Sequence, residues 1–238
     1  MEEEKNWLVK SISYDQHEIL YNIMRMHNNG KPYECDMTYS KGNFYGKFKM
    51  KLSDGTVFEY EIPKPLHKFD VSPMDDETVR IEPDGKLPLE DFSIESIVID
   101  LPFVVSPPTA PSITEKKKGS NIIFNRFHGY YPVKNLFKSY SHWIKEAYRV
   151  LKDGGICVFK TQNTISGSVF YCTEEFSWLE AQKNGFYVLD RFTLVAKNRL
   201  ISGKVKNQQH ARNFSSVFWV FKKGGKHKVV DYYKFLDD

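Results

Sequence analysis

The sequence predicts an α/β fold in which an open, twisted and largely parallel sheet forms the centre of one domain, residues 1–238. Short apolar runs typical of buried strands alternate along the chain with longer segments whose apolar residues recur at helical spacing. The chain has 238 residues, of which 41% are hydrophobic, and this is enough for one substantial core. Two departures from a purely parallel sheet are expected, namely a hairpin inserted after the first strand and an antiparallel last strand.

The first half of the chain contains a predicted helix, the inserted hairpin and four short strands. Apolar residues at helical spacing predict the helix over residues 15–27, and Asn28-Asn29-Gly30 ends it with residues that tolerate a left-handed backbone. Residues 46–63 alternate between apolar and charged side chains on both sides of a Ser-Asp-Gly-Thr turn, which is typical of a hairpin with a solvent-facing side. Four apolar runs predict strands at residues 32–36, 67–71, 78–81 and 96–100.

The second half begins with a long loop, residues 104–131, which carries several prolines, a run of three lysines and no periodicity. We expect this loop to be mobile, because loops of this length are usually functional or disordered. Helical spacing then predicts a helix over residues 133–151, and Thr173 is the expected N-cap of a further helix that ends near residue 183. The remaining strands are expected at 156–161, 186–195 and 216–222, with the basic loop 197–213 between the last two.

Composition and cysteine usage predict a cytoplasmic protein without a membrane anchor. No apolar run approaches the roughly 18 residues needed to span a bilayer, and the acidic start MEEEKNW does not resemble a signal peptide. Cys35, Cys157 and Cys172 lie far apart, which indicates reduced thiols and no metal-ligand spacing. The net charge is only +4, so affinity for nucleic acid has to come from local clusters of basic residues.

Four of the predicted strands end in an aspartate or are followed by one: Asp36, Asp70, Asp84 and Asp100. In open α/β sheets, ligands bind outside the carboxyl ends of the strands. Four carboxylates at one edge repel one another unless a ligand, water or a helix N-terminus meets them. Each aspartate taken alone is as well explained as a turn residue that caps a loop. The four together favour a ligand site at this edge of the sheet.

Three segments resemble class I S-adenosyl-L-methionine-dependent methyltransferases, and among them the amino-methyltransferases of nucleic acids. Asp100-Leu101-Pro102-Phe103 is similar to the family signature D-P-P-Y/F/W, and YRVLKDGGICVFK, residues 148–160, is similar to its R-V-L-K-P-G-G stretch. The segment DGKLPLEDFSIESIVID resembles the part of the family that leads from the adenine-contacting acid into the fourth strand. The matches follow the family's order over residues 32–222. The resemblance implies a Rossmann-like class I methyltransferase fold and S-adenosyl-L-methionine as the cofactor.

The family's cofactor loop, D-P-F-x-G-x-G, falls on residues 36–42 of this chain. Its aspartate and its last glycine are present, and Ser40 stands in place of the first glycine, where a small residue lets the backbone approach the cofactor. The cofactor-binding residues implied by the resemblance are Asp36, Thr38, Ser40 and Gly42 at the amino-acid end, Asp70 at the ribose hydroxyls and Asp84 at the adenine amino group.

The tetrapeptide that starts at Asp100 has the groups that methylation of a base amino group requires. The lone pair of that nitrogen is delocalised into the ring, and two acceptors that hold its N–H protons favour a pyramidal, nucleophilic nitrogen. The implied acceptors are the Asp100 carboxylate and the Leu101 carbonyl, while Pro102 fixes the turn and Phe103 stacks on the extruded base. Leu101 replaces the family's usual proline, which bears on rate and substrate choice. The alternative interpretation is a strand that simply ends in a proline turn.

Basic residues gather in the two long loops that are expected to leave the same edge of the sheet. Lysine and arginine among asparagine and glutamine suit contacts with phosphates and base edges. The alternative is that both segments are ordinary solvated loops. The candidate nucleic-acid-binding residues are Lys116, Lys117, Lys118, Arg126, Lys197, Arg199, Lys204, Lys206 and Arg212.

The favoured function is therefore an enzyme that methylates an exocyclic base amino group in DNA, with adenine ahead of cytosine. RNA is the alternative acceptor, because the same tetrapeptide serves RNA methyltransferases. A second class of function is a non-catalytic methyltransferase-like module that binds nucleic acid or a partner enzyme. A chain of this length has little room for a large target-recognition domain, so a homodimer or a partner subunit is expected. A nicotinamide-dependent enzyme is disfavoured, because no G-x-G-x-x-G follows the first strand.

Overall fold

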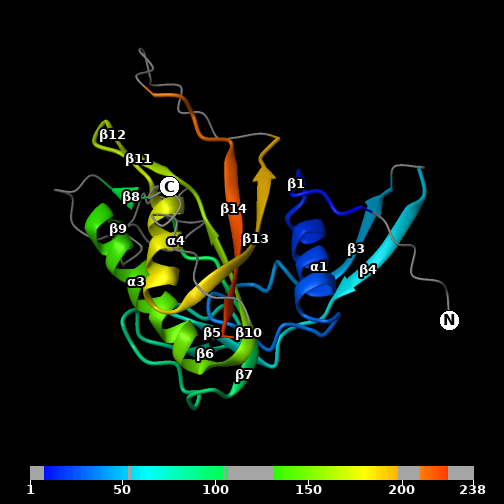
Figure 1. The fold of residues 1–238 in the computed structure, drawn as a ribbon, viewed down its shortest axis with the longest axis horizontal. Helices are drawn as coiled ribbons and strands as arrows, with labels where there is room; N and C mark the ends of the chain where they lie inside the picture. Colours follow the sequence, from blue (N-terminus) through cyan, green and yellow to red (C-terminus); the bar gives the residue numbers. More distant parts are fainter. Residues whose placement is uncertain (1–7, 53–54, 104, 107–130, 198–209, 225–238) are drawn as a thin grey trace, which may run out of the picture.

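A computed structural model of the chain describes residues 8–52, 55–103, 105–106, 131–197 and 210–224. Its central feature is an 8-stranded sheet (Figure 1). The strands, in spatial order, are β1 (Ile12–Ser13), β13 (Phe186–Val195), β14 (Ser215–Lys223), β10 (Leu151–Thr161), β7 (Ile94–Ile99), β2 (Cys35–Asp36), β5 (His67–Asp70) and β6 (Val79–Arg80).

The strand directions confirm the predicted fold class. β6, β5, β2, β7 and β10 pair parallel in turn, β14 is antiparallel to both β10 and β13, and β1 is parallel to β13. The antiparallel last strand is thus confirmed. The chain order reverses at β2, which has β5 on one side and β7 on the other. In sheets of this kind such a reversal opens a crevice at the carboxyl ends of the strands, where ligands bind.

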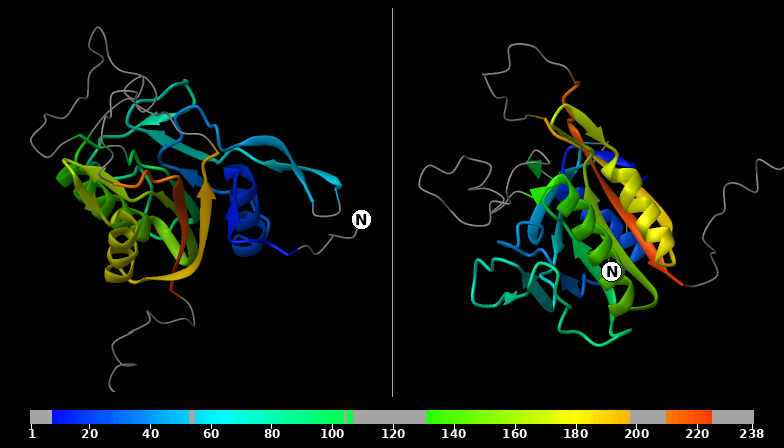
Figure 2. Two further views of the ribbon diagram at one scale, coloured as in Figure 1. Left: turned by 90° about the horizontal axis from the view of Figure 1, so that it is seen from above. Right: turned by 90° about the vertical axis from the view of Figure 1, so that its left-hand side faces the viewer.

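Each face of the sheet is covered by a different set of elements (Figures 1 and 2). Helices α3 (Val133–Val150) and α4 (Thr173–Lys183) pack on one face. Helix α1 (Gln16–His27) and the hairpin β3 (Gly46–Lys51)–β4 (Val57–Ile62) pack on the other. β7 shows how the sequence serves both faces, because Ile97 and Ile99 belong to the α3 side of the core and Val98 to the α1 side.

The hairpin takes the place of a covering helix after the first parallel strand, as predicted. Its six residue pairs alternate between pairs that contain a lysine, such as Lys49 and Glu59, which are exposed, and pairs without a charged residue, such as Phe48 and Tyr60. The aromatic side packs on α1, where the rings of Tyr21 and Tyr60 lie 4.5 Å apart. The hairpin is therefore half surface ribbon and half core.

The two predicted long helices are present with nearly the predicted bounds. The carboxylate of Asp15 accepts a hydrogen bond from the backbone N–H of His17 and caps α1. The prediction that Thr173 caps α4 is wrong, because Cys172 holds the N-cap position. Thr173 lies in the first turn, and its hydroxyl donates to the carbonyl oxygen of Gln162 just after β10. The helix is thereby tied to the sheet edge.

Several short strands are not predicted from the sequence. They are β1, the antiparallel pair β11 (Thr164–Ser166) and β12 (Val169–Tyr171), and the parallel pair β8 (Val105–Ser106) and β9 (Tyr131–Pro132). The last pair joins the two ends of the predicted loop 104–131, whose residues 107–130 lie outside the described part of the chain. Among the described residues, no helix combines the length and the apolar character that a membrane crossing requires.

Candidate functional site

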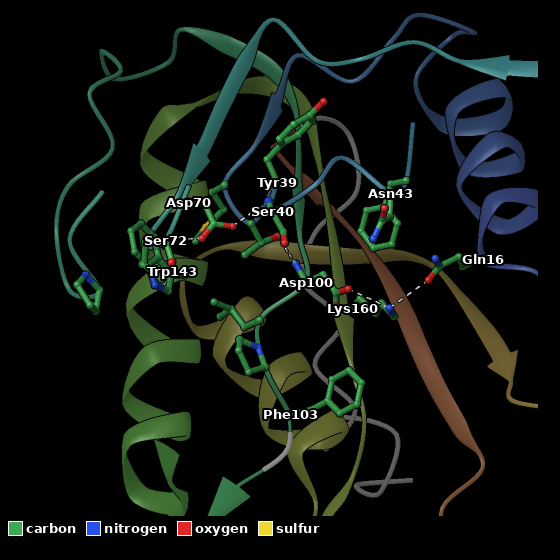
Figure 3. Close-up of a pocket in the computed structure, with 17 residues that line it drawn as sticks. Gln16, Tyr39, Ser40, Asn43, Asp70, Ser72, Asp100, Phe103, Trp143 and Lys160 are labelled. Atoms are coloured by element: carbon green, nitrogen blue, oxygen red, sulfur yellow. Dashed lines mark hydrogen bonds and ion pairs between the residues drawn. The ribbon is translucent and has the colours of Figure 1, made fainter. Parts of the chain in front are cut away.

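A cavity of about 510 Å³ lies at the carboxyl ends of β2, β5 and β7, where the strand order reverses (Figure 3). Its walls are formed by the segments that follow these three strands, residues 37–40, 43–44, 70–72 and 100–103. Gln16 of α1, Trp143 of α3, Lys160 of β10 and Pro83 complete the lining. The predicted catalytic tetrapeptide, with Thr38, Ser40 and Asp70, therefore lines one cavity.

Asp36 lies beneath this cavity rather than in its wall, with only 1% of its surface exposed. One carboxylate oxygen accepts from the backbone N–H and the hydroxyl of Thr38, at 2.8 and 3.1 Å, and the other accepts from the Tyr45 hydroxyl at 2.7 Å. Burial raises the pKa of Asp36 to about 7, although these hydrogen bonds oppose the rise. In the described structure Asp36 thus shapes the loop, and a direct cofactor contact stays a prediction.

Thr38 connects the loop after β2 to the loop after β7. Its hydroxyl oxygen accepts from the backbone N–H of Asp100 at 2.8 Å, while its hydroxyl hydrogen points to Asp36. A chain of hydrogen bonds therefore runs from the Asp100 backbone to the buried Asp36 carboxylate. The predicted cofactor loop and the predicted catalytic loop are held in a fixed relation by one threonine.

Ser40 and Asp70, for which the resemblance implies contacts at the amino-acid end and at the ribose hydroxyls of the cofactor, lie close together. The backbone N–H of Ser40 donates to one Asp70 oxygen at 2.8 Å, and the backbone N–H of Ser72 donates to the other at 2.7 Å. Ser40 has a φ of 50°, in the left-handed region that glycine adopts most easily. A residue at this position therefore has to tolerate a positive φ.

The structure places Gly42 and Asp84 outside the cavity wall. Gly42 has a φ of +66°, and a Cβ added there would overlap the hydroxyl of Tyr39. Its absent side chain leaves room for that ring. Asp84 is exposed, whereas its neighbour Pro83 lines the cavity. The cofactor-binding roles that the resemblance implies for Gly42 and Asp84 remain predictions.

The carboxylate of Asp100 forms an ion pair with Lys160, at 2.9 Å between Oδ2 and Nζ. Lys160 is only 8% exposed, and its ammonium lies 3.3 Å from Oε1 of Gln16. The ammonium also lies over the rings of Phe44 and Phe218, 5.2 and 5.5 Å from their centroids. Figure 3 shows the ion pair among the side chains that line the cavity, with Lys160 between Asp100 and Gln16.

Lys160 lines the cavity but is not among the predicted site residues, although the sequence contains a signal for it. It is the only charged residue in ICVFKT, the apolar end of β10. β10 is parallel to β7 with Phe159 opposite Ile99, so the next residues in register are Lys160 and Asp100. A lone lysine near the carboxyl end of a buried strand, beside a strand that ends in aspartate, predicts such a pair.

Leu101, Pro102 and Phe103 all line the cavity, and Leu101 is buried. In Figure 3, Phe103 lies on one side of Asp100, and Asp70 and Tyr39 lie on the other. Asp100 is therefore positioned between a region next to the predicted cofactor loop and a region next to the ring of Phe103. A reaction between two bound molecules needs two adjacent binding regions of this kind.

Of the candidate nucleic-acid-binding residues, Lys197 and Arg212 are described. The Lys197 ammonium lies 5.7 Å from the centroid of the Tyr14 ring, and Arg212 is partly buried. Neither lines the cavity. The Asn213 side chain donates to the carbonyl oxygen of Asn163 at 3.1 Å, which holds this segment at the carboxyl end of β10. The other candidates, Lys116, Lys117, Lys118, Arg126, Arg199, Lys204 and Lys206, lie outside the described residues.

No protein-family model matches the chain, and no curated protein matches it in sequence. Solved structures do align with it. A protein of Thermus thermophilus, provisionally described as a DNA modification methylase and complexed with S-adenosyl-L-methionine, aligns over 61% of this chain and 54% of its own, with 13% identity and a TM-score of 0.35. PvuII DNA methyltransferase, described as cytosine-N4-specific, aligns over 63% of this chain and 49% of its own, with 19% identity and a TM-score of 0.36.

A third aligned structure comes from the complex between the Haloferax volcanii Trm112 methyltransferase activator and a methyltransferase. It aligns over 90% of this chain and 91% of its own, with 12% identity and a TM-score of 0.45. The chain spans about half the length of the first two proteins. All three TM-scores are below 0.5, and all three identities are below 20%.

Proposed function

We propose that this chain is an S-adenosyl-L-methionine-dependent methyltransferase that methylates an exocyclic amino group of a nucleic-acid base, with adenine in DNA as the favoured acceptor. The observation that carries the proposal is the position of Asp100. It lines the same cavity as Ser40 and Asp70, and an aromatic ring, Phe103, follows it closely in the same wall. A methyl donor bound beside Ser40 and Asp70 and a flat acceptor bound beside Phe103 would meet at the Asp100 carboxylate.

The cavity residues fit the proposed cofactor. The volume of about 510 Å³ lies in the range of roughly 300–1,000 Å³ typical of small-molecule sites. Asp70 places a carboxylate, the group suited to ribose hydroxyls, beside the backbone of Ser40. Pro83 and Trp143 offer apolar surface for an adenine ring. When bound, S-adenosyl-L-methionine supplies an electrophilic methyl group on a positively charged sulfur.

The chain itself contributes acceptors, a stacking ring and fixed positions. Asp100 holds one amino proton of the base through its carboxylate, and the Leu101 backbone carbonyl holds the other. The ring of Phe103 stacks on the base, which returns roughly 1–3 kcal/mol of the few kcal/mol needed to unstack it. The hydrogen bond from Asp100 to Thr38 fixes the acceptor loop against the cofactor loop. The rate enhancement then comes from orientation rather than from a covalent intermediate.

Replacement of Asp100 tests the proposed chemistry. Asp100→Asn keeps an oxygen that can accept from Lys160 but loses the charge, and we expect methyl transfer to fall by at least about 100-fold because the amino proton loses a charged acceptor. Asp100→Ala is expected to abolish transfer, and it also leaves the buried ammonium of Lys160 unpaired. Exposed Asp76 provides the matched control, Asp76→Ala, which should transfer methyl at the wild-type rate.

The measurement is transfer of a labelled methyl group to separate pools of DNA and RNA, with cofactor binding followed by titration calorimetry. Wild-type transfer by Asp100→Asn would exclude the proposed role of this residue. Transfer to RNA alone would identify the alternative acceptor. Binding of nucleic acid without any heat from the cofactor would favour the non-catalytic module.

The proposed nucleic-acid contacts are tested by salt. Removing one phosphate contact should reduce the slope of log affinity against log salt by about 0.9 for duplex DNA. We therefore expect the double variant Lys197→Gln, Arg212→Gln to bind DNA with a flatter salt response than the wild-type protein. An unchanged slope would show that these two residues do not contact phosphate.

A further inference from the structure

We infer that Lys160 and Asp100 together recognise the amidine edge of the acceptor base, that is, the amino group and the ring nitrogen beside it. Asp100 accepts from the amino group, and Lys160 donates to the ring nitrogen. The inference rests on the proposed function and assigns to Lys160 a role in substrate choice.

The ammonium of Lys160 has hydrogen-bonding capacity left for a ligand. It carries three N–H donors. Within the part of the chain that the structure describes, its two hydrogen-bond acceptors are Oδ2 of Asp100 and Oε1 of Gln16, at 2.9 and 3.3 Å. The rings of Phe44 and Phe218 flank it without accepting a conventional hydrogen bond. Lys160 lines the cavity, so its third N–H is available to a molecule bound there.

A purely structural role does not account for this lysine. Its side chain is 10% exposed and that of Asp100 is 23% exposed, so the lysine bears the greater cost of desolvation. Buried ion pairs can often be replaced by packed apolar residues without loss of stability. Apolar side chains occupy the positions just before Lys160 in β10. A charged residue at this position of the strand, paired with Asp100 in the cavity wall, indicates a role in the cavity.

The pair presents an acceptor and a donor side by side. Oδ2 of Asp100 is taken by Lys160, and within the described residues Oδ1 has no hydrogen-bond donor. Adenine places its N6 amino group next to N1, and cytosine places its N4 amino group next to N3, so each base offers a donor and an acceptor side by side. The amine of a lysine side chain lacks such a neighbour. The pair therefore favours amino-substituted bases over simple amines such as that of lysine, whereas the side-chain amides of glutamine and asparagine also place a donor beside an acceptor.

A donor at the ring nitrogen orients the base but also withdraws electrons from the amino group. We therefore expect Lys160 to act on binding of the acceptor more than on the chemical step. Its removal should raise KM more than it lowers kcat. Removal of a residue that merely stabilised the Asp100 carboxylate would instead lower kcat more than it raised KM.

The test is a cycle that removes the donor and the ring nitrogen separately. Wild-type protein and Lys160→Met are compared on oligodeoxynucleotides containing the methylated base or its deaza analogue, 1-deazaadenine or 3-deazacytosine, by kcat/KM for labelled methyl transfer. We expect kcat/KM of the wild-type protein to be roughly 10- to 100-fold lower on the analogue than on the natural base, because a hydrogen bond from a charged donor is lost. For Lys160→Met, kcat/KM on the analogue should be lower by less than about 3-fold. Lys160→Arg, which retains a donor, should recover part of the discrimination.

Lys31→Met is the matched control, because Lys31 pairs with Glu95 at 2.7 Å at an exposed position and does not line the cavity. It should discriminate against the analogue as the wild-type protein does. Equal penalties in wild-type protein and Lys160→Met would overturn the inference while leaving the proposed methylation intact. Absence of wild-type transfer to any nucleic acid would remove both. If Lys160→Met does not fold, the same comparison with Lys160→Leu, which also lacks a donor, decides.

Discussion

The pH dependence of stability provides a direct test of the buried carboxylate beneath the cavity. Asp36 accepts hydrogen bonds from Thr38 and Tyr45, yet its burial raises its pKa to about 7 from an ordinary value of 3.8. In the pH range between these two values, the folded protein therefore holds a proton that the unfolded chain releases. The contribution of Asp36 to the free energy of unfolding therefore falls as the pH rises through this range, and it becomes constant above about pH 7.

The magnitude follows from the two pKa values. A full shift from 3.8 to about 7 corresponds to roughly 4 kcal/mol. Between about pH 5 and about pH 8, the same two values give a loss of roughly 2.5 kcal/mol in the free energy of unfolding from Asp36 alone. Asp36→Asn removes this loss because an amide does not ionise. Its carbonyl oxygen can accept from Thr38, and its N–H can donate to the Tyr45 hydroxyl oxygen, so the fold should persist.

The assay is urea unfolding of wild-type protein and Asp36→Asn at several pH values. The stability of the variant relative to the wild-type protein should rise by roughly 2.5 kcal/mol from about pH 5 to about pH 8. Tyr45→Phe serves as a second variant, because loss of its hydroxyl removes a donor to the carboxylate and should move the pKa further upward. A stability difference between Asp36→Asn and wild type that does not change with pH would refute the reasoning.

Two further predictions concern residues that hold the cavity walls and the end of α3. Gly42→Ala should destabilise the protein more in thermal unfolding than Gly30→Ala. Both residues have a positive φ, but only a Cβ at position 42 would overlap the side chain of Tyr39. Equal losses of stability would show that Gly42 is not needed to make room for that ring. Lys223 is 2% exposed and donates to the carbonyl oxygens of Tyr148, in the last turn of α3, and Leu151, the first residue of β10. Lys223→Met should therefore lower the free energy of unfolding by roughly 2–4 kcal/mol in urea titration. A loss below about 0.5 kcal/mol would show that these carbonyl groups find other partners.

Local patterns predict most of the fold correctly because each depends on residues near one another in sequence. The α1 helix has its apolar positions at helical spacing and its cap at Asp15. The hairpin has alternation on both sides of a turn. Asp100 stands at the end of an apolar run, and the structure places it at the end of β7. Periods of two and of 3.6 residues suffice for such predictions.

The composition of the site depends on which strand ends share an edge and how far each is buried. Lys160 lies 60 residues from Asp100 in sequence, and only the parallel register of β10 on β7 brings the two together. Asp36 is almost fully buried and Asp84 is exposed, although the sequence places both at the ends of strand-like segments. A sequence records the order of residues along a strand. The order of strands in the sheet, which sets the neighbours and the desolvation of every charged group, is decided by the packing of the whole chain.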